Sequence, residues 1–236
     1  MNKHLLLTCA ILLVACGSGL QAQVNPAFPA LTIDKAAIRS LDKAEQLYEK
    51  GNFKRAYFIY RNELAPIGDK YAQYMVGYMH LTGQATDADR VVAAAWYRLA
   101  AERGTREFVQ VHDQLIVSLT PEQLEEHDRV FRDLRKHYGD LHLLMRAVRQ
   151  DYAILRQGTT GSRLGAGSSS VVVIDMRNRA AYKSGGDYYA KIESRLKSRL
   201  ELIAQYMQGE GVDIDIDSIS LEELEARVYQ VLESAD

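Results

Sequence analysis

The sequence predicts an all-α protein, an α-solenoid in which antiparallel helix pairs stack side by side. Three observations predict this fold class. Residues 72–104 carry two amphipathic helical patterns joined by a short turn, and apolar residues recur there at three- and four-residue steps. Small residues alternate with large ones in the second pattern, as in helices that interlock at short distance. Residues 120–123 read Thr-Pro-Glu-Gln, a capping box with proline in the first turn of a helix.

Within residues 72–104, glycines and aspartates mark where the helices end and begin. Gly83 is expected to end the first helix in the left-handed conformation, and Gly104 to end the second. Either Asp87 or Asp89 is expected to cap the second helix. Gly77 interrupts the first helical pattern, where glycine is normally unfavourable. We therefore expect it to let a second helix come close.

The residues of this stretch resemble a Sel1-like repeat, a relative of the tetratricopeptide repeat (TPR). The resemblance rests on Ala72, Gln73, Tyr74, Gly77, Met79, Gly83, Asp89, Ala93, Trp96, Tyr97, Ala100, Ala101 and Gly104. The chain departs from the family at Ala85 and Thr86, where Gly-Val is preferred, and at Val92, usually a lysine. The resemblance implies a TPR/Sel1-like solenoid of helix hairpins whose inner surface binds a protein or peptide.

A second unit precedes this one. The order Ala44, Leu47, Tyr48, Gly51, Phe53, Ala56, Tyr60 is similar to a tetratricopeptide unit. Ala56 and Ala93 are then equivalent positions 37 residues apart, which fits a repeat with a lengthened turn. Helices expected over 105–119, 121–139 and 140–156 resemble degenerate repeats, because a single unit cannot bury its apolar face alone. The predicted repeat domain is 34–156, with Asp34 as the first cap.

The first residues predict export and a lipid anchor. Lys3 and the apolar run that follows form a signal peptide over 1–15, too short to span a bilayer. Residues 13–16, Leu-Val-Ala-Cys, resemble a bacterial lipobox, which implies lipidation of Cys16. An ordinary secretory signal is the alternative. Gly17 is not the aspartate of inner-membrane retention, so the resemblance implies an outer-membrane lipoprotein that faces the periplasm. Residues 16–33 are expected to form a flexible tether. Loss of Cys9 with the signal leaves no disulfide.

The C-terminal region carries no motif that we associate with a family. Residues 157–186 are predicted to be a linker with one short strand, Val171 to Asp175. Residues 187–236 are predicted to be a helical segment, with one helix from Asp187 to about Gln208 and a last helix after Ser220.

Three candidate chemical sites were weighed against structural alternatives. Residues 158–167 are glycine-rich but lack the Gly-Lys-Ser/Thr ending of a phosphate loop, and composition favours a linker. The aspartates at 213, 215 and 217 begin like a calcium loop, but Ser218 replaces its glycine and Leu224 its glutamate. Asp133, His137 and His142 lack a further ligand for zinc. No metal and no small-molecule cofactor is expected.

Net charge and tyrosine content indicate which class of partner the chain binds. The formal net charge is −2, and −3 once Lys3 is lost with the signal, so nothing favours nucleic acid. Fourteen tyrosines against five phenylalanines suit binding surfaces, because tyrosine combines a large ring with a polar tip. The resemblance places Tyr74 and Tyr78 on the inner surface as partner-binding candidates. Core packing between neighbouring helices is the alternative.

The sequence thus predicts a non-enzymatic adaptor or scaffold lipoprotein that binds an envelope protein or peptide and reaches the membrane through its anchor. The alternative is a cell-envelope enzyme, or an accessory factor acting on peptidoglycan, with its chemistry in residues 157–236. A purely structural lipoprotein is a third reading.

Overall fold

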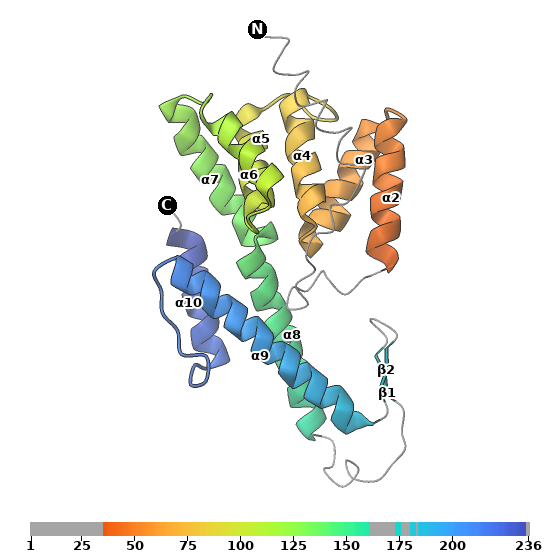
Figure 1. Cartoon of the computed structure of the whole chain (residues 1–236), viewed down its shortest axis with the longest axis vertical. Helices are drawn as coiled ribbons and strands as arrows, with labels where there is room; N and C mark the ends of the chain where they lie inside the picture. The colour runs from red at the N-terminus through yellow and green to blue at the C-terminus, as the bar shows by residue number, and fades with distance from the viewer. Residues whose placement is uncertain (1–34, 161–172, 176–179, 183, 235–236) are drawn as a thin grey trace.

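A row of paired helices leads into a C-terminal bundle of three helices (Figure 1). The computed structural model describes residues 35–160, 173–175, 180–182 and 184–234. Cys16, the signal peptide, the tether and Asp34 lie outside the described residues. The helices of the row are α2 (Lys35–Glu49), α3 (Phe53–Ile59), α4 (Lys70–Thr82), α5 (Arg90–Ala101), α6 (Arg106–Ile116) and α7 (Pro121–Tyr138).

The helices of the row pack as successive pairs. Helix α2 packs on α3 and α4 on α5, and α5 also contacts both α6 and α7. Their shared core holds small and large side chains in contact, among them Ala56, Met79, Ala95 and Trp96, all at most 1% exposed. The predicted all-α class and the TPR/Sel1-like helical repeat are confirmed. The equivalent alanines Ala56 and Ala93 are both fully buried.

Several local signals act as predicted at helix ends. Gly83 ends α4 with φ 71°, in the left-handed region. Of the two candidate caps of α5, Asp89 fills the role, and its carboxylate accepts hydrogen bonds from the backbone N–H of Val91 and Val92. The capping box at Thr120 is complete. Asn52 occupies the N-cap of α3 but makes no side-chain cap hydrogen bond.

The second helix of the first pair changes geometry along its length. After α3 it continues as a π-helix, η2 (Tyr60–Leu64), and a 3-10 turn, η3 (Ala65–Ile67), and it stops at Gly68 with φ 81°. Asp69 then caps α4 by accepting from the backbone N–H of Ala72 at 2.8 Å. These irregular turns position Tyr60 and Asp69 beside α2 and α4.

The C-terminal bundle is built by α8 (Asp140–Thr160), α9 (Gly185–Gly209) and α10 (Leu221–Ser234). Its core is a separate cluster, to which α8 contributes Leu144 and Val148, α9 Ile203 and α10 Leu224. The core clusters of the row therefore end before Gly139, and α8, assigned from sequence to the repeat domain, shares the core of the last two helices.

The structure differs from the sequence-based expectation around the linker. Helix α8 continues to Thr160 instead of ending near Arg156, so the glycine at 158 does not end it. The expected strand appears as β1 (Val173–Asp175), but a second strand, β2 (Ala180–Tyr182), pairs with it antiparallel where a loop was expected. Within the described residues, no helix is both long and apolar enough to cross a membrane.

Candidate functional site

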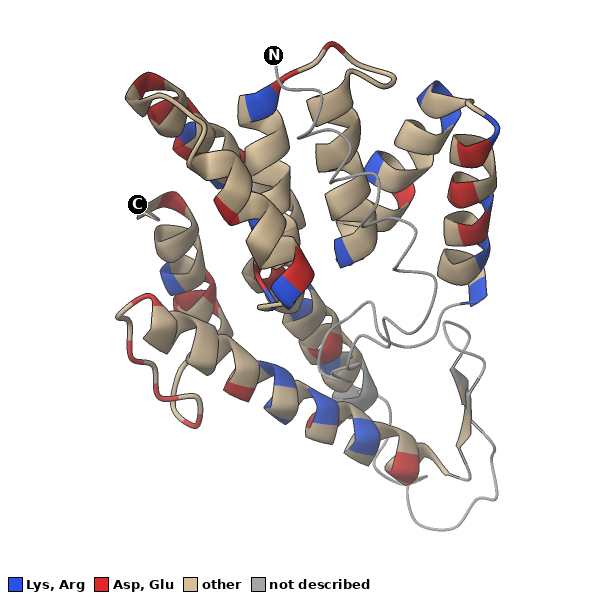
Figure 2. Ribbon diagram, turned by 45° about the horizontal axis from the view of Figure 1, so that its top comes forward, with Lys and Arg blue, Asp and Glu red and all other residues tan. Residues whose placement is uncertain are grey.

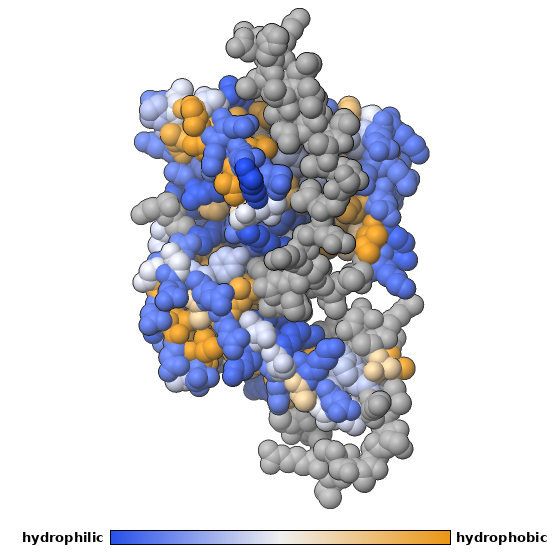
Figure 3. Space-filling model, in the orientation of Figure 1, coloured by the Kyte–Doolittle hydropathy of each residue, from blue (hydrophilic) through white to orange (hydrophobic). Residues whose placement is uncertain are grey.

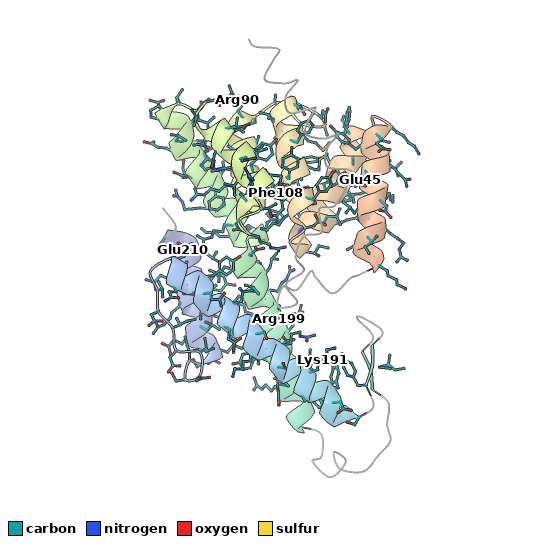
Figure 4. All side chains as sticks on the ribbon, viewed as in Figure 1. Glu45, Arg90, Phe108, Lys191, Arg199 and Glu210 are labelled. Atoms are coloured by element: carbon teal, nitrogen blue, oxygen red, sulfur yellow. The ribbon has the colours of Figure 1, made fainter. Side chains whose placement is uncertain are left out.

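A row of aromatic rings runs across the first three helix pairs. The ring of Tyr60 lies 6.4 Å from that of Tyr71, edge to face, and Tyr71 stacks on Tyr74 at 6.5 Å. Tyr74 stacks in turn on Phe108 of α6 at 5.3 Å. We call these four residues the aromatic row. It connects η2, α4 and α6, and the labelled Phe108 marks its α6 end (Figure 4).

Close packing of α4 on α5 supports the middle of the row. Gly77 faces the carbonyl of Ala93, which would lie 3.1 Å from a Cβ at this position. The ring of Tyr97, 1% exposed, fills the space beside Gly77 and stacks on Tyr74 at 5.2 Å. The expected close approach at Gly77 is therefore present. The buried ring of Tyr97 therefore packs directly against the ring of Tyr74.

The two tyrosines predicted to bind a partner occupy different settings. Tyr74 is half-buried in the aromatic row between Tyr97 and Phe108. Tyr78 is half-buried one turn further along α4, outside the row, and packs against the cluster that contains Ala93, Ala94, Tyr97 and Leu115. Burial, followed by the influence of Tyr78, raises the pKa of Tyr48 to about 12. Both candidates thus pack against neighbouring helices and keep part of the side chain at the surface.

A buried ionic cluster joins the row of pairs to the C-terminal bundle. Lys70 of α4 donates to Glu102 at 2.8 Å and lies 3.2 Å from Asp140, the first residue of α8. Arg103 donates to both carboxylate oxygens of Asp140, at 2.9 and 2.8 Å, and Tyr206 of α9 donates to it at 3.1 Å. The two cations balance the two carboxylates, as burial of charge requires.

The electrostatics of this cluster follow from burial and pairing. Burial alone would raise the pKa of the Asp140 carboxyl, but Lys70 and Arg103 outweigh it and hold that pKa below its usual value. Burial raises the pKa of Glu102, although Lys70 opposes the change. Sequence analysis missed this cluster because its members lie up to 136 residues apart, and no local pattern links Lys70 to Tyr206.

Three further ion pairs attach the last helices. Arg135 of α7 pairs with Glu210, which follows α9. Asp151 of α8, fully buried, pairs with both Arg195 and Arg199 of α9. The C-terminal helices therefore pack on the row of pairs.

The acidic and histidine positions considered from sequence have local hydrogen-bonding partners. The carboxylate of Asp215 accepts from the backbone N–H of Asp217 at 3.1 Å and from the hydroxyl of Ser218 at 2.8 Å. His137 is hydrogen-bonded to the backbone carbonyl of Asp133 at 2.9 Å. In the parts of the chain that the structure describes, no three His, Cys, Asp or Glu side chains come together as metal ligands would.

The pair formed by α4 and α5, with its caps and its glycine contact, is the part of the chain that a family model matches. The family model of the Sel1 repeat matches residues 70–105. The match begins at the first residue of α4 and ends just before α6. Sel1 repeats generally mediate protein–protein interaction, and proteins that carry them are typically non-enzymatic adaptors. The comparisons with curated proteins and with solved structures find no match.

The neighbouring pairs extend the Sel1-like unit in space. Helices α2 and α3 pack on one side of it, and α6 and α7 on the other, outside the matched residues. The aromatic row therefore crosses from the pair before the repeat, through its first helix, into the pair after it.

Proposed function

We propose that this chain is a non-enzymatic adaptor lipoprotein, anchored through Cys16 to the outer membrane, whose aromatic row receives a protein or peptide of the cell envelope. The observation that carries the proposal is the continuity of the row from Tyr60 to Phe108 across consecutive helix pairs. A peptide lying across these pairs would meet the half-buried rings of Tyr71 and Tyr74, which rest on the buried rings of Tyr60 and Phe108. Tyrosine is enriched where proteins bind one another.

The rest of the described surface supports this choice of face. Apolar patches in Figure 3 are broken up by hydrophilic residues over both the row of pairs and the C-terminal bundle. The exposed large apolar side chains lie on different elements: Ile38, Phe58, Val117, Ile174 and Tyr229. Scattered single residues of this kind are normal on a protein surface.

The test is recovery of a partner from envelope extract by in-vivo crosslinking and pull-down. The Tyr74→Ala/Tyr78→Ala variant should recover at least five-fold less of the partner that the wild type captures. Tyr229→Ala, which removes an exposed tyrosine from α10, should recover as much as the wild type. Equal recovery by the double variant and the wild type would remove these two residues from the proposal.

The anchor has a separate test. Cys16→Ser should release the chain from the membrane fraction into the soluble periplasmic fraction, because thioether attachment of lipid needs the cysteine sulfur. Unchanged retention in membranes would refute lipidation at Cys16 and leave the proposal about the aromatic row untouched.

A further inference from the structure

The hairpin of β1 and β2 lies beside the first turns of α9 (Figure 1). Ile174 of β1 stands directly opposite Ala181 of β2 in the strand register. Residues in direct register across a hairpin present their side chains to the same face. Both residues are exposed, Ile174 to 57%, and Figure 3 shows apolar surface at the position of the hairpin. One face of the hairpin therefore presents apolar side chains to the solvent.

Tyrosine rings hold the other side of the hairpin on α9. Tyr182 follows Ala181 in β2, so its side chain points to the opposite face of the strand. Its ring lies 5.1 Å from that of Tyr188, which lies 5.3 Å from that of Tyr189. The ammonium group of Lys191 lies 5.6 Å from the centre of the Tyr182 ring, and Figure 4 shows Lys191 on α9 beside the hairpin. The three rings are half-buried, and Lys191 is exposed.

Basic residues concentrate in the sequence around this hairpin. Residues 156–191 contain six lysines and arginines but only two aspartates and no glutamate, a net charge of +4. Since the whole chain carries −2, the remaining residues carry −6. The six basic residues are Arg156, Arg163, Arg177, Arg179, Lys183 and Lys191. Figure 2 shows basic residues on the turns of α9 next to the hairpin. A charge asymmetry of this kind favours a polyanionic partner.

An anionic lipid surface is the polyanion that fits these groups together. Lysine and arginine are attracted to anionic headgroups, and tyrosine is enriched where a membrane meets water, because its ring is apolar and its hydroxyl polar. An exposed isoleucine gains stability when it leaves water for the acyl boundary. A nucleic acid would use the basic residues and the rings, but it offers Ile174 no apolar surroundings. Ile174 therefore decides between the two kinds of polyanion.

We propose that the hairpin patch, defined as Ile174, Ala181, Tyr182, Tyr188 and Lys191, lies on an anionic lipid surface. Ile174 and Ala181 enter the headgroup region, and the ammonium group of Lys191 contacts lipid phosphates. This contact goes beyond the proposed function, because it is a second attachment to the membrane that is independent of lipid on Cys16. Salt screens exposed charges, so the contact is weak and reversible. It orients an anchored chain and does not replace the anchor.

The experiment measures binding of the chain to lipid vesicles by co-sedimentation. The chain is produced without residues 1–15 and with Cys16→Ser, so that neither a signal peptide nor an acyl chain inserts. None of the altered positions belongs to the described fold. Vesicles of phosphatidylcholine and phosphatidylglycerol in equal parts are anionic, and phosphatidylcholine alone is the neutral control. At low salt the anionic vesicles should bind at least ten-fold more tightly than the neutral ones, and high salt should release the chain.

Two variants and two matched controls test the patch. Ile174→Asp and Lys191→Glu should each weaken binding to the anionic vesicles at least five-fold. Val117→Asp, at the exposed end of α6, and Lys54→Glu, on α3, make the same changes elsewhere and should leave it unchanged. All four variants should melt at the temperature of the parent chain, because the altered side chains are exposed. Lys191→Glu keeps both strands of the hairpin intact, so it tests the patch even if Ile174→Asp disturbs the strand pairing.

A fluorescent label locates the contact independently of affinity. The only cysteines of the sequence are Cys9 and Cys16, and the test chain contains neither. Ile174→Cys therefore introduces a single thiol for an environment-sensitive dye. Its emission should shift to the blue on anionic vesicles, whereas the same dye attached through Val117→Cys should not shift.

Three results would overturn the proposal: equal binding to anionic and neutral vesicles, no binding to either, or equal losses in the patch variants and their controls. An oligonucleotide that binds through Lys191 more tightly than the vesicles do, with no effect of Ile174→Asp, would also overturn it and assign the patch to nucleic acid. Each of these results leaves the adaptor and its anchor standing, because those are tested through Tyr74, Tyr78 and Cys16, the last in salt-washed membranes.

Discussion

No side chain fits between Gly77 and the ring of Tyr97: a Cβ placed on Gly77 would lie 2.8 Å from Cδ1 and 2.9 Å from Cε1 of that ring. Helices α4 and α5 therefore approach at a distance that only glycine permits. Tyr97 cannot yield, because it is buried and stacks on Tyr74.

Gly77→Ala should lower the free energy of unfolding by about 2 kcal/mol through overpacking, even though alanine favours a helix by about 1 kcal/mol. Urea denaturation measures the change. Gly209→Ala is the matched control, since Gly209 ends α9 and a Cβ there meets nothing within 4 Å. An unchanged urea midpoint for Gly77→Ala would contradict this prediction. It would show that α4 and α5 can move apart without a loss of stability.

Tyr74 combines stacking with partial exposure, and two substitutions separate these roles. Tyr74→Phe keeps the contacts with Tyr97 and Phe108, so the unfolding free energy should change by less than about 1.5 kcal/mol. Tyr74→Ala removes the ring from between its neighbours and should cost about 2–3 kcal/mol. If the phenylalanine variant recovers less envelope partner while its stability is unchanged, the hydroxyl itself contacts the partner.

Asp140 holds two cations, so its removal should be far more costly than loss of a surface pair. Asp140→Asn leaves Lys70 and Arg103 facing each other with only Glu102 to balance them, and should cost about 3–5 kcal/mol. Asp128→Asn is the control, because Asp128 pairs with Arg98 at a half-exposed site and the pair contributes under about 1 kcal/mol. Equal losses in urea denaturation would contradict the structural role of the cluster.

Four histidines should make the fold sensitive to mild acid. Burial is the main cause that lowers the pKa of His80, His112, His127 and His142. A histidine with a lowered pKa in the folded state binds fewer protons than in the unfolded chain. Its contribution to stability is complete at a pH above its pKa in the unfolded chain, about 6.5. That contribution is lost as the pH falls through its pKa in the folded state. The melting temperature should therefore decrease between pH 7 and pH 5.

His127→Gln tests this dependence at one site. It removes a titrating ring whose neighbour His112 lies 5.8 Å away, centroid to centroid. The decrease in melting temperature between pH 7 and pH 5 should be smaller in this variant than in the wild type. A decrease of the same size would assign the acid sensitivity to other groups.

Ala85 adopts φ 72° in the turn between α4 and α5, a left-handed conformation that disfavours any residue with a Cβ. It is also a position where the resemblance led us to expect glycine. Ala85→Gly should raise the unfolding free energy by about 0.5 kcal/mol, the relief of strain exceeding the entropy lost. Ala88→Gly, in the same turn without positive φ, should lower it by a similar amount, about 0.5 kcal/mol. Urea denaturation measures whether the unfolding free energy rises for Ala85→Gly and falls for Ala88→Gly.

Sequence patterns predicted the features that depend on neighbours in the chain. A glycine can reverse the chain at Gly83, and the side chains of Asp89 and Thr120 reach backbone N–H groups within three residues. Packing altered the features that have no such local cause. Helix α8 packs on α9 and continues past the predicted linker boundary, and β2 pairs with β1 where a loop was expected.

The sequence by itself determined that helices form, where most of them begin and end, and that α4 and α5 meet through small residues in a Sel1-like unit. Tertiary structure alone decided which charges are buried together. Lys70 pairs with Asp140, and Asp151 with Arg195 and Arg199, because those pairings depend on the spatial order of whole helices. A charge on the chain carries no information about the partner that folding brings to it, since the interaction acts through space and not along the sequence.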